Sequence, residues 1–253
     1  MIITLTTDFG QRDSFVGAMK GVVLGIAPEA QIVDIAHAIP PGDIRAAAFA
    51  LMTAAPFFPA ETIHLVVIDP GVGSARKGIG IRCAQATLLG PDNGVLSWAV
   101  KDERSLEIRS LENPQIRLPR MSATFHGRDL FAPAAAWLAR GRPFAEIGPE
   151  VNDFHRLDWA SATPASGGWQ TEIVHVDVYG NAITALSGEQ AADKNYVMLP
   201  GERRVAIAPF YSAVPRGSPL AVVGSSGLLE IAINGGDAAK AFSLRPGTQV
   251  VVA

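Results

Sequence analysis

Two polar segments of the chain carry residue types that could position and deprotonate a water molecule. In Val67-Ile-Asp-Pro-Gly-Val-Gly-Ser-Ala-Arg76, an aspartate and an arginine flank a glycine-rich stretch that follows an apolar run. Ala123-Thr-Phe-His-Gly-Arg-Asp129 supplies a histidine in a glycine-containing turn. A carboxylate, a guanidinium and an imidazole in one cleft can orient a water and accept its proton. We therefore predict that Asp69, Arg76 and His126 form a catalytic group.

A second aspartate, Asp8, stands in a sequence context similar to that of Asp69. Each ends an apolar run that reads as a strand, and each is followed by a glycine, Gly10 and Gly71 respectively. Ligands of open α/β sheets gather beyond the carboxyl ends of the strands, so we predict both carboxylates at a ligand-binding edge. The alternative is that each aspartate caps a following helix, which for one aspartate alone is an equally good interpretation.

Two glycine-containing motifs in the last third of the chain could bind a small polar molecule. Asp177-Val-Tyr-Gly-Asn181 groups an acid, an aromatic ring and an amide, and Gly224-Ser-Ser-Gly-Leu-Leu-Glu230 adds hydroxyl and backbone N–H groups. Taken singly, each motif is slightly better interpreted as a hairpin turn. As a pair, they could hold an amino-acid head group and stack on an aromatic base.

The elements that must position the first motifs alternate between strands and helices. Short apolar runs predict strands, and apolar residues at helical spacing predict helices. The predicted strands cover residues 2–7, 31–35, 62–68 and 86–89, and the predicted helices cover 13–26, 43–54, 94–100 and 129–140. This order predicts an N-terminal α/β domain, residues 1–160, with a mostly parallel central sheet.

The pattern changes in the second part of the chain. Residues 159–169 are small, polar and rich in proline and glycine, which is typical of a linker. Short strand candidates without convincing helices follow, at residues 171–178, 196–199, 204–208, 220–223 and 250–253. We predict a smaller C-terminal all-β, barrel-like domain over residues 169–253.

Composition excludes several classes of protein. The 253 residues are 48% hydrophobic and 18% charged, which is typical of a soluble globular protein. The net charge of −3 argues against nucleic-acid binding, which favours a basic face. A single cysteine, Cys83, excludes an intramolecular disulfide and a thiolate metal cluster. The longest apolar stretch, residues 46–60, contains two prolines and is too short to span a bilayer, so we expect a cytoplasmic protein without membrane contact.

Six motifs in this order resemble those of the S-adenosyl-L-methionine hydrolases (hydroxide adenosyltransferases), which are relatives of the fluorinases and chlorinases. The motifs are Thr6-Thr-Asp-Phe-Gly10, Asp69-Pro-Gly-Val-Gly73 with Arg76, Pro91-Asp-Asn-Gly94, Phe125-His-Gly-Arg-Asp129, Asp177-Val-Tyr-Gly-Asn181 and Ser225-Ser-Gly-Leu-Leu-Glu-Ile-Ala232. The resemblance implies a homotrimer that binds its small-molecule substrate between the first domain of one subunit and the second domain of its neighbour. It implies no cofactor and no metal beyond the substrate itself.

The resemblance also implies roles for individual residues. Asp69, Arg76 and His126 match the triad with which the hydrolases hold the attacking water, and the halogenases lack that triad. The implied reaction is therefore hydrolysis of S-adenosyl-L-methionine to adenosine and L-methionine by attack at C5′ of the ribose. The matched binding residues are Asp8 for the ribose hydroxyls, Asp177 for the methionine ammonium, Ser225 for its carboxylate, Tyr179 and Asn181 for the adenine region, and Glu230 in the same binding set.

Three alternatives remain open at this point. A halogenase of the same fold would use the same substrate. Asp8, Asp69, Asp92 and His126 are also hard metal-ligand types, which would suit a metal-dependent phosphoesterase. A nucleoside-binding protein without catalysis would keep the fold and the binding residues alone.

Overall fold

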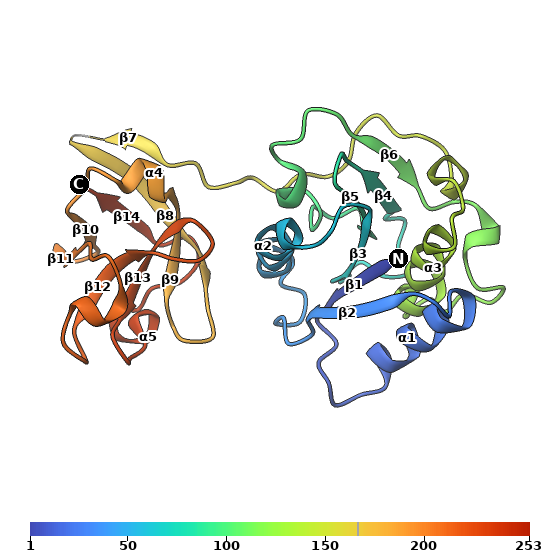
Figure 1. Cartoon of the computed structure of the whole chain (residues 1–253), viewed down its shortest axis with the longest axis horizontal. Helices are drawn as coiled ribbons and strands as arrows, with labels where there is room; N and C mark the ends of the chain where they lie inside the picture. The colour runs from blue at the N-terminus through green and yellow to red at the C-terminus, as the bar shows by residue number, and fades with distance from the viewer. Residues whose placement is uncertain (166) are drawn as a thin grey trace. The chain divides into compact units, whose positions relative to one another are not determined.

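Two units, Met1–Leu157 and Asp158–Ala253, make up the chain, and each has its own hydrophobic core (Figure 1). The computed structural model describes residues 1–165 and 167–253. Mixed α/β structure in the first unit and antiparallel β structure in the second confirm the predicted fold class. Over these described ranges, no helix is both long and apolar enough to cross a membrane.

A six-stranded sheet forms the centre of the first unit, in the order β2-β1-β3-β5-β4-β6. Its strands are β1 (Ile2–Thr7), β2 (Gln31–Ala36), β3 (Thr62–Val67), β4 (Gly78–Arg82), β5 (Ala86–Pro91) and β6 (Glu107–Ser110). β1 pairs in parallel with β2 and β3, and β3 with β5, whereas β4 is antiparallel to both of its neighbours. Every residue of β3 is buried, as expected for a parallel strand covered on both faces.

Helices cover both faces of this sheet. α1 (Phe15–Ile26) and α3 (Ala132–Ala139) share one core with Leu65 of β3, while α2 (Ile44–Ala54) shares a second core with Val66. Leu65 and Val66 point to opposite faces of the sheet because successive side chains of a strand alternate between its two faces. Pro133 lies in the first turn of α3, directly after the π-helical turn Gly127–Phe131.

The second unit is an eight-stranded antiparallel sheet in the order β11-β10-β14-β8-β9-β13-β12, with β7 added on β8. The strands are β7 (Thr163–Ala165), β8 (Gly168–Val176), β9 (Ala182–Ser187), β10 (Tyr196–Leu199), β11 (Arg203–Ala206), β12 (Pro219–Val223), β13 (Leu228–Ile233) and β14 (Gln249–Val252). A bridge between Ile207 and Ala221 joins the two ends of this order. The sheet therefore curls into a nearly closed barrel, which leaves little open edge.

The predicted helix over residues 94–100 is wrong. Only a 3-10 turn, Trp98–Val100, forms there. Gly94 has a φ of +94°, and the side chains of Asn93 and Ser97 form hydrogen bonds with the backbone of Val95 and Gly94. Such local side-chain bonds compete with the helical backbone pattern, so the segment stays a series of turns.

The predicted linker over residues 159–169 is also partly wrong, because β7 and the start of β8 lie within it. β4, β6, β7, β9 and β13 lie outside the strand ranges given from the sequence. Short helical elements complete the fold: α4 (Gly188–Ala191), α5 (Ala238–Phe242), a π-helical turn (Gly127–Phe131), and 3-10 turns at Ala55–Phe57, Pro114–Ile116, Phe144–Ile147 and Tyr211–Ala213.

Candidate active site

The carboxyl edge of the parallel strands carries two of the predicted acids. Asp8 follows β1 directly, and Asp69 comes two residues after the end of β3, with the last residues of the two strands paired. Oδ2 of Asp8 accepts a hydrogen bond from the backbone N–H of Gly42 at 2.8 Å. The N-cap of α1 is Ser14, so Asp8 does not cap the helix that follows it. The helix-cap alternative is therefore wrong for Asp8.

Arg76 joins the other two predicted catalytic residues. Its Nε donates to Oδ1 of Asp69 at 2.8 Å, and its NH2 group donates to Oδ2 of the same carboxylate. The NH2 group also lies 2.9 Å from Nδ1 of His126. The side chains of Arg76 and Asp69 are only 12% and 5% exposed, so this forked ion pair is shielded from water. The structure thus brings Asp69, Arg76 and His126 into one hydrogen-bonded cluster.

Close packing of two loops holds this cluster together. Gly73 has a φ of +79°, and a Cβ atom at this position would lie 2.3 Å from the carbonyl oxygen of Ala123. One loop carries Asp69 and Arg76, and the other carries His126. Only a glycine at position 73 lets these two loops pack so closely. The glycine-rich sequence between the acid and the arginine is therefore a requirement of the site's geometry.

The segment after His126 is fixed by a buried carboxylate. Asp129 is fully buried, accepts two hydrogen bonds from the Arg128 guanidinium and accepts a third from the backbone N–H of Ser122. His126 itself immediately precedes the π-helical turn, a geometry that is frequent at functional sites. These contacts fix the backbone on both sides of the imidazole.

The electrostatics of the cluster keep His126 neutral. Burial and the nearby Arg76 charge lower the pKa of His126, and the charges of Asp69 and Asp129 oppose that shift only in part. Arg76 has no acceptor, so the Nδ1 atom that it contacts must accept the hydrogen bond. We assign the neutral tautomer with its proton on Nε2. A neutral imidazole next to a fixed cation can take a proton from a bound water.

The second unit places three predicted binding residues in one turn, the hairpin connection between β8 and β9. Oδ1 of Asp177 accepts from the backbone N–H groups of Tyr179 and Asn181, and Oδ2 accepts from Nδ2 of Asn181 at 2.9 Å. The ring of Tyr179 is 75% exposed. Ser225 is also exposed, in the turn between β12 and β13. The interpretation of both motifs as hairpin turns is confirmed.

Tyr211 is a member of this second cluster that the sequence analysis missed. Nδ2 of Asn181 donates to its hydroxyl at 3.3 Å, and that hydroxyl donates to Oε1 of Glu230 in a short hydrogen bond. Burial raises the pKa of Glu230 and the Asp177 charge adds to the shift, although the Tyr211 hydrogen bond opposes it. Tyr211 lies in a short 3-10 turn outside any motif. The only signal in the sequence was an aromatic pair, Phe210 and Tyr211.

The residues proposed as alternative metal ligands are held by protein groups. Both oxygens of Asp69 accept from Arg76, and Oδ1 of Asp92 accepts from the backbone N–H of His155. Among the residues that the structure describes, no group of three His, Cys, Asp or Glu side chains is arranged to hold a metal ion.

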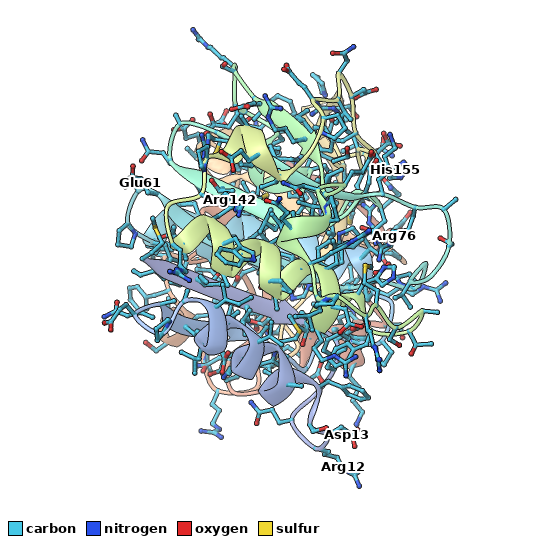
Figure 2. The ribbon with its side chains drawn as sticks, turned by 90° about the vertical axis from the view of Figure 1, so that its right-hand side faces the viewer. Arg12, Asp13, Glu61, Arg76, Arg142 and His155 are labelled. Carbon is cyan, nitrogen blue, oxygen red and sulfur yellow. The ribbon has the colours of Figure 1, made fainter. Side chains whose placement is uncertain are left out.

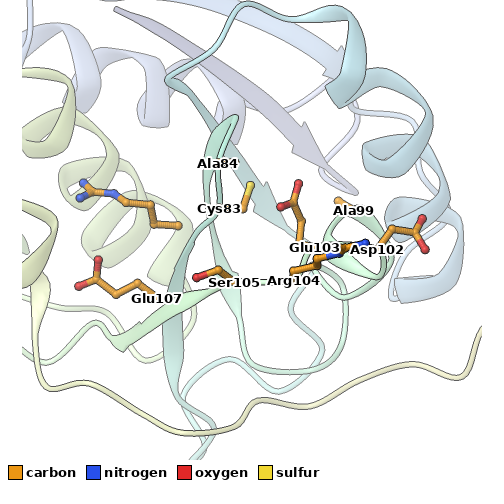
Figure 3. Close-up of a pocket in the computed structure, with 9 residues that line it drawn as sticks. Cys83, Ala84, Ala99, Asp102, Glu103, Arg104, Ser105 and Glu107 are labelled. Atoms are coloured by element: carbon orange, nitrogen blue, oxygen red, sulfur yellow. The ribbon is translucent and has the colours of Figure 1, made fainter.

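A surface cavity of about 720 Å³ lies elsewhere in the first unit, beside the β4–β5 hairpin (Figure 3). Its described lining includes Arg82, Cys83 and Arg104, and the candidate site residues lie outside it. Arg76 and Glu61, which precedes β3, lie on opposite sides of the unit (Figure 2). The candidate site is the Asp69–Arg76–His126 cluster, because its groups converge through hydrogen bonds.

Comparison with known proteins shows the family to which the chain is similar. The model of the SAM hydroxide adenosyltransferase N-terminal domain matches residues 3–148, and that of the corresponding C-terminal domain matches residues 171–251. The chain is 41% identical to an (R)-S-adenosyl-L-methionine hydrolase of Salinispora arenicola, covering 99% of this chain and 97% of the relative. It is 42% identical to an enzyme of the same name from Thermus thermophilus, covering 96% of both chains.

More distant relatives and solved structures complete the comparison. A fluorinase of Actinoplanes sp. is 25% identical, with 99% of this chain and 97% of the relative covered. The crystal structure of an uncharacterized conserved protein from Thermotoga maritima superposes with a TM-score of 0.94 at 34% identity, covering all of both chains. The domain models together match most of the chain, and the hydrolases are more similar to it than the fluorinase is. The chain therefore belongs to the SAM hydroxide adenosyltransferase family.

Proposed function

We propose that this protein hydrolyses S-adenosyl-L-methionine to adenosine and L-methionine. The observation that carries the proposal is the Asp69–Arg76–His126 cluster, in which a buried cation contacts a neutral imidazole. Relatives that share about two fifths of their residues with this chain carry the name of this activity. The cluster supplies what hydrolysis needs and what displacement by a halide does not need, a group that takes a proton from water.

The reaction requires little from the protein at the leaving group. Attack of a water oxygen at C5′ forms the C–O bond while the C5′–S bond breaks, and its electron pair returns to sulfur. The sulfonium becomes a neutral thioether, so no general acid is needed. What remains is to hold the water in line with the C–S bond and to remove its proton. Well-oriented reactants alone gain roughly 7–11 kcal/mol.

The contacts of the cluster divide these tasks among its members. Both oxygens of Asp69 accept from Arg76, so we assign Asp69 the role of orienting the guanidinium. Arg76 stabilises the hydroxide that develops as the proton leaves. The water takes the place of the direct contact between Arg76 NH2 and His126 Nδ1, accepting from the former and donating to the latter. His126 is then the proton acceptor.

The remaining features of the site follow from the family and belong to the same proposal. Asp8 holds the ribose hydroxyls, and its carboxylate is fixed by the Gly42 N–H. Asp177, Tyr179, Asn181, Ser225 and Glu230 bind the methionine and adenine portions. The proposal also includes two domains, at residues 1–160 and 169–253, and a homotrimer with its sites at the subunit interfaces. It further includes a cytoplasmic location and a reaction without an added cofactor. The carboxylate of Asp177 is fixed by hydrogen bonds within the β8–β9 turn, and its negative charge suits an ammonium group.

The deciding experiment is chromatography of the purified protein incubated with S-adenosyl-L-methionine, with and without chelator, and with chloride present. We expect adenosine and methionine in equal amounts, formed at the same rate with chelator. A 5′-chloro nucleoside would assign the protein to the halogenases. Loss of activity with chelator would favour metal-dependent chemistry. Binding of S-adenosyl-L-methionine without formation of any product would favour the alternative of a nucleoside-binding protein without catalysis.

Replacing Asp8 with alanine is expected to raise KM for S-adenosyl-L-methionine by roughly 10- to 100-fold. Hydrogen bonds to a charged group are worth about 1.5–3 kcal/mol, and about 1.4 kcal/mol is tenfold in affinity. Because Asp8 is remote from the bond that breaks, kcat at saturation should change little. Steady-state kinetics separate the two constants, and a wild-type KM would refute the ribose assignment.

A further inference from the structure

A buried histidine that the proposed reaction does not use contacts the residue directly before Asp8. His37 follows β2 and is 5% exposed, and Thr7 ends β1 and is fully buried. Oγ1 of Thr7 and Nδ1 of His37 lie 2.8 Å apart. The register between β1 and β2 shifts at Leu5 and Thr6, just before this contact. Thr7 pairs with Val67 of β3 but has no partner in the register with β2, so the contact with His37 joins this end of β1 to the segment after β2.

The contacts around His37 set the direction of this hydrogen bond. Nε2 of His37 lies 3.0 Å from Oδ1 of Asp34, an ion-pair distance, although the ring N–H is not aimed straight at that oxygen. Burial pushes the pKa of Asp34 up, but the contacts with Lys20 and His37 outweigh it and lower that pKa. Asp34 is therefore a carboxylate, and the proton of His37 belongs on the Nε2 that faces it. Nδ1 then accepts from the Thr7 hydroxyl.

A series of polar contacts connects the protein surface with the loop that carries Asp8. Lys20 donates to Oδ2 of Asp34 at 2.6 Å, and the Thr7 hydroxyl donates to His37. Oγ1 of Thr7 in turn accepts from the backbone N–H of Phe9 at 3.3 Å. Thr7 is thus hydrogen-bonded across Asp8, to the residue that follows it. The Thr7 hydroxyl and the Phe9 N–H thus each have an assigned acceptor, while Nε2 of His37 makes only the ion-pair contact with Asp34.

Two further contacts tie the same loop to the segment after His37. The backbone N–H of Gly10 donates to the carbonyl oxygen of His37 at 2.7 Å, and the backbone N–H of Gly42 donates to Asp8. Asp8 therefore lies between two points at which its loop is fixed to the segment from His37 to Gly42. The direction of its carboxylate depends on both points.

The geometry points to Thr7 and His37 as positioning residues for substrate affinity, which act by fixing the backbone on either side of Asp8. The inference rests on the proposed function, because Asp8 must contact the substrate for its direction to matter. Neither residue reaches the reacting atoms in this account, so their effect falls on KM and leaves kcat nearly unchanged. The two residues are buried, which keeps them off the binding surface.

The test compares Thr7→Val, which keeps the shape and removes the hydroxyl, with Thr7→Ser, which keeps the hydroxyl. We expect Thr7→Val to raise KM about 3- to 10-fold, the size of one net hydrogen bond, with kcat within twofold. Thr7→Ser should retain KM near that of the wild type. In the Asp8→Ala background, Thr7→Val should raise KM less than twofold, because the carboxylate that it positions is gone.

A purely structural role predicts a different result. The inference would be overturned if Thr7→Val raised KM by the same factor in the wild-type and Asp8→Ala backgrounds. It would also be overturned if Thr7→Ser raised KM as much as Thr7→Val, or if Thr7→Val left KM unchanged. Absence of any turnover by the wild type would instead overturn the proposed function. If Thr7→Val does not fold, His37→Gln and His37→Asn replace it. Glutamine keeps the group that faces Asp34 and loses the acceptor for Thr7, so KM should rise, whereas asparagine keeps that acceptor and should retain KM.

Discussion

Replacing His126 with alanine, or Asp69 with asparagine, is expected to lower kcat for S-adenosyl-L-methionine hydrolysis by roughly 100- to 10,000-fold. The first change removes the proton acceptor. The second keeps the shape of the side chain but removes the charge and one of the two acceptors that hold Arg76. KM should stay within a few-fold in both variants, because neither residue contacts the methionine or adenine portions in the proposed site.

The pH dependence of kcat/KM, which reports the free enzyme, gives this prediction a second readout. The lowered pKa of His126 means that the wild type should stay active below the usual histidine value of 6.5 and lose activity as the pH falls through the lowered pKa. A protonated Nδ1 can neither accept from water nor face Arg76. The Asp69 charge raises the pKa of His126, so in Asp69→Asn the acidic limb of the remaining activity should move to lower pH.

A matched control separates these effects from a general loss of charge. Asp102 is a carboxylate of the same unit whose side chain is 86% exposed, and Asp102→Asn should keep the wild-type kcat and acidic limb. Unchanged turnover in both His126→Ala and Asp69→Asn would refute the proposal that these residues activate the water. An acidic limb that moves to higher pH in Asp69→Asn would contradict the proton acceptor assigned here.

The parallel strands were predictable because each is a short run rich in isoleucine, leucine, valine and threonine. β3, Thr62–Val67, is buried throughout and has no competing pattern. β13, Leu228–Ile233, has the same apolar character but is interrupted by Glu230, an acid that the sequence analysis placed in a turn-like binding motif. That carboxyl is buried in the fold, where it accepts a hydrogen bond from Tyr211 in a distant turn. β9 is rich in small residues, which favour neither a helix nor a strand strongly.

The proximity of Asp69 and Arg76 was predictable for a different reason. Asp69 and Arg76 are close in sequence and separated by glycines, so a turn had to bring them together. The contact with His126 depends on two loops that pack at Gly73, which no local pattern announces. The partnership of Thr7 and His37 depends on a register shift between adjacent strands, and register is decided by the whole sheet.

Arg76→Lys is expected to lower kcat roughly 100- to 1,000-fold although it keeps the positive charge. The guanidinium contacts Asp69 through both Nε and NH2, and the same NH2 group reaches His126. A lysine ammonium is a single point of charge and cannot reproduce this planar fork. The water would then lose its fixed donor, and Asp69 would lose one of the two hydrogen bonds that orient its partner.

The comparison with Arg76→Ala decides whether charge or geometry matters more. If the fork is essential, both variants should be equally slow, and added guanidinium should restore part of the activity of Arg76→Ala alone, because its cavity can admit the ion. Arg142, whose guanidinium contacts Glu146 and Gln115 outside the proposed site, offers the matched control, and Arg142→Lys should keep the wild-type kcat. Wild-type turnover in Arg76→Lys would show that a nearby positive charge is sufficient, and the forked contact with Asp69 would then have only a structural role.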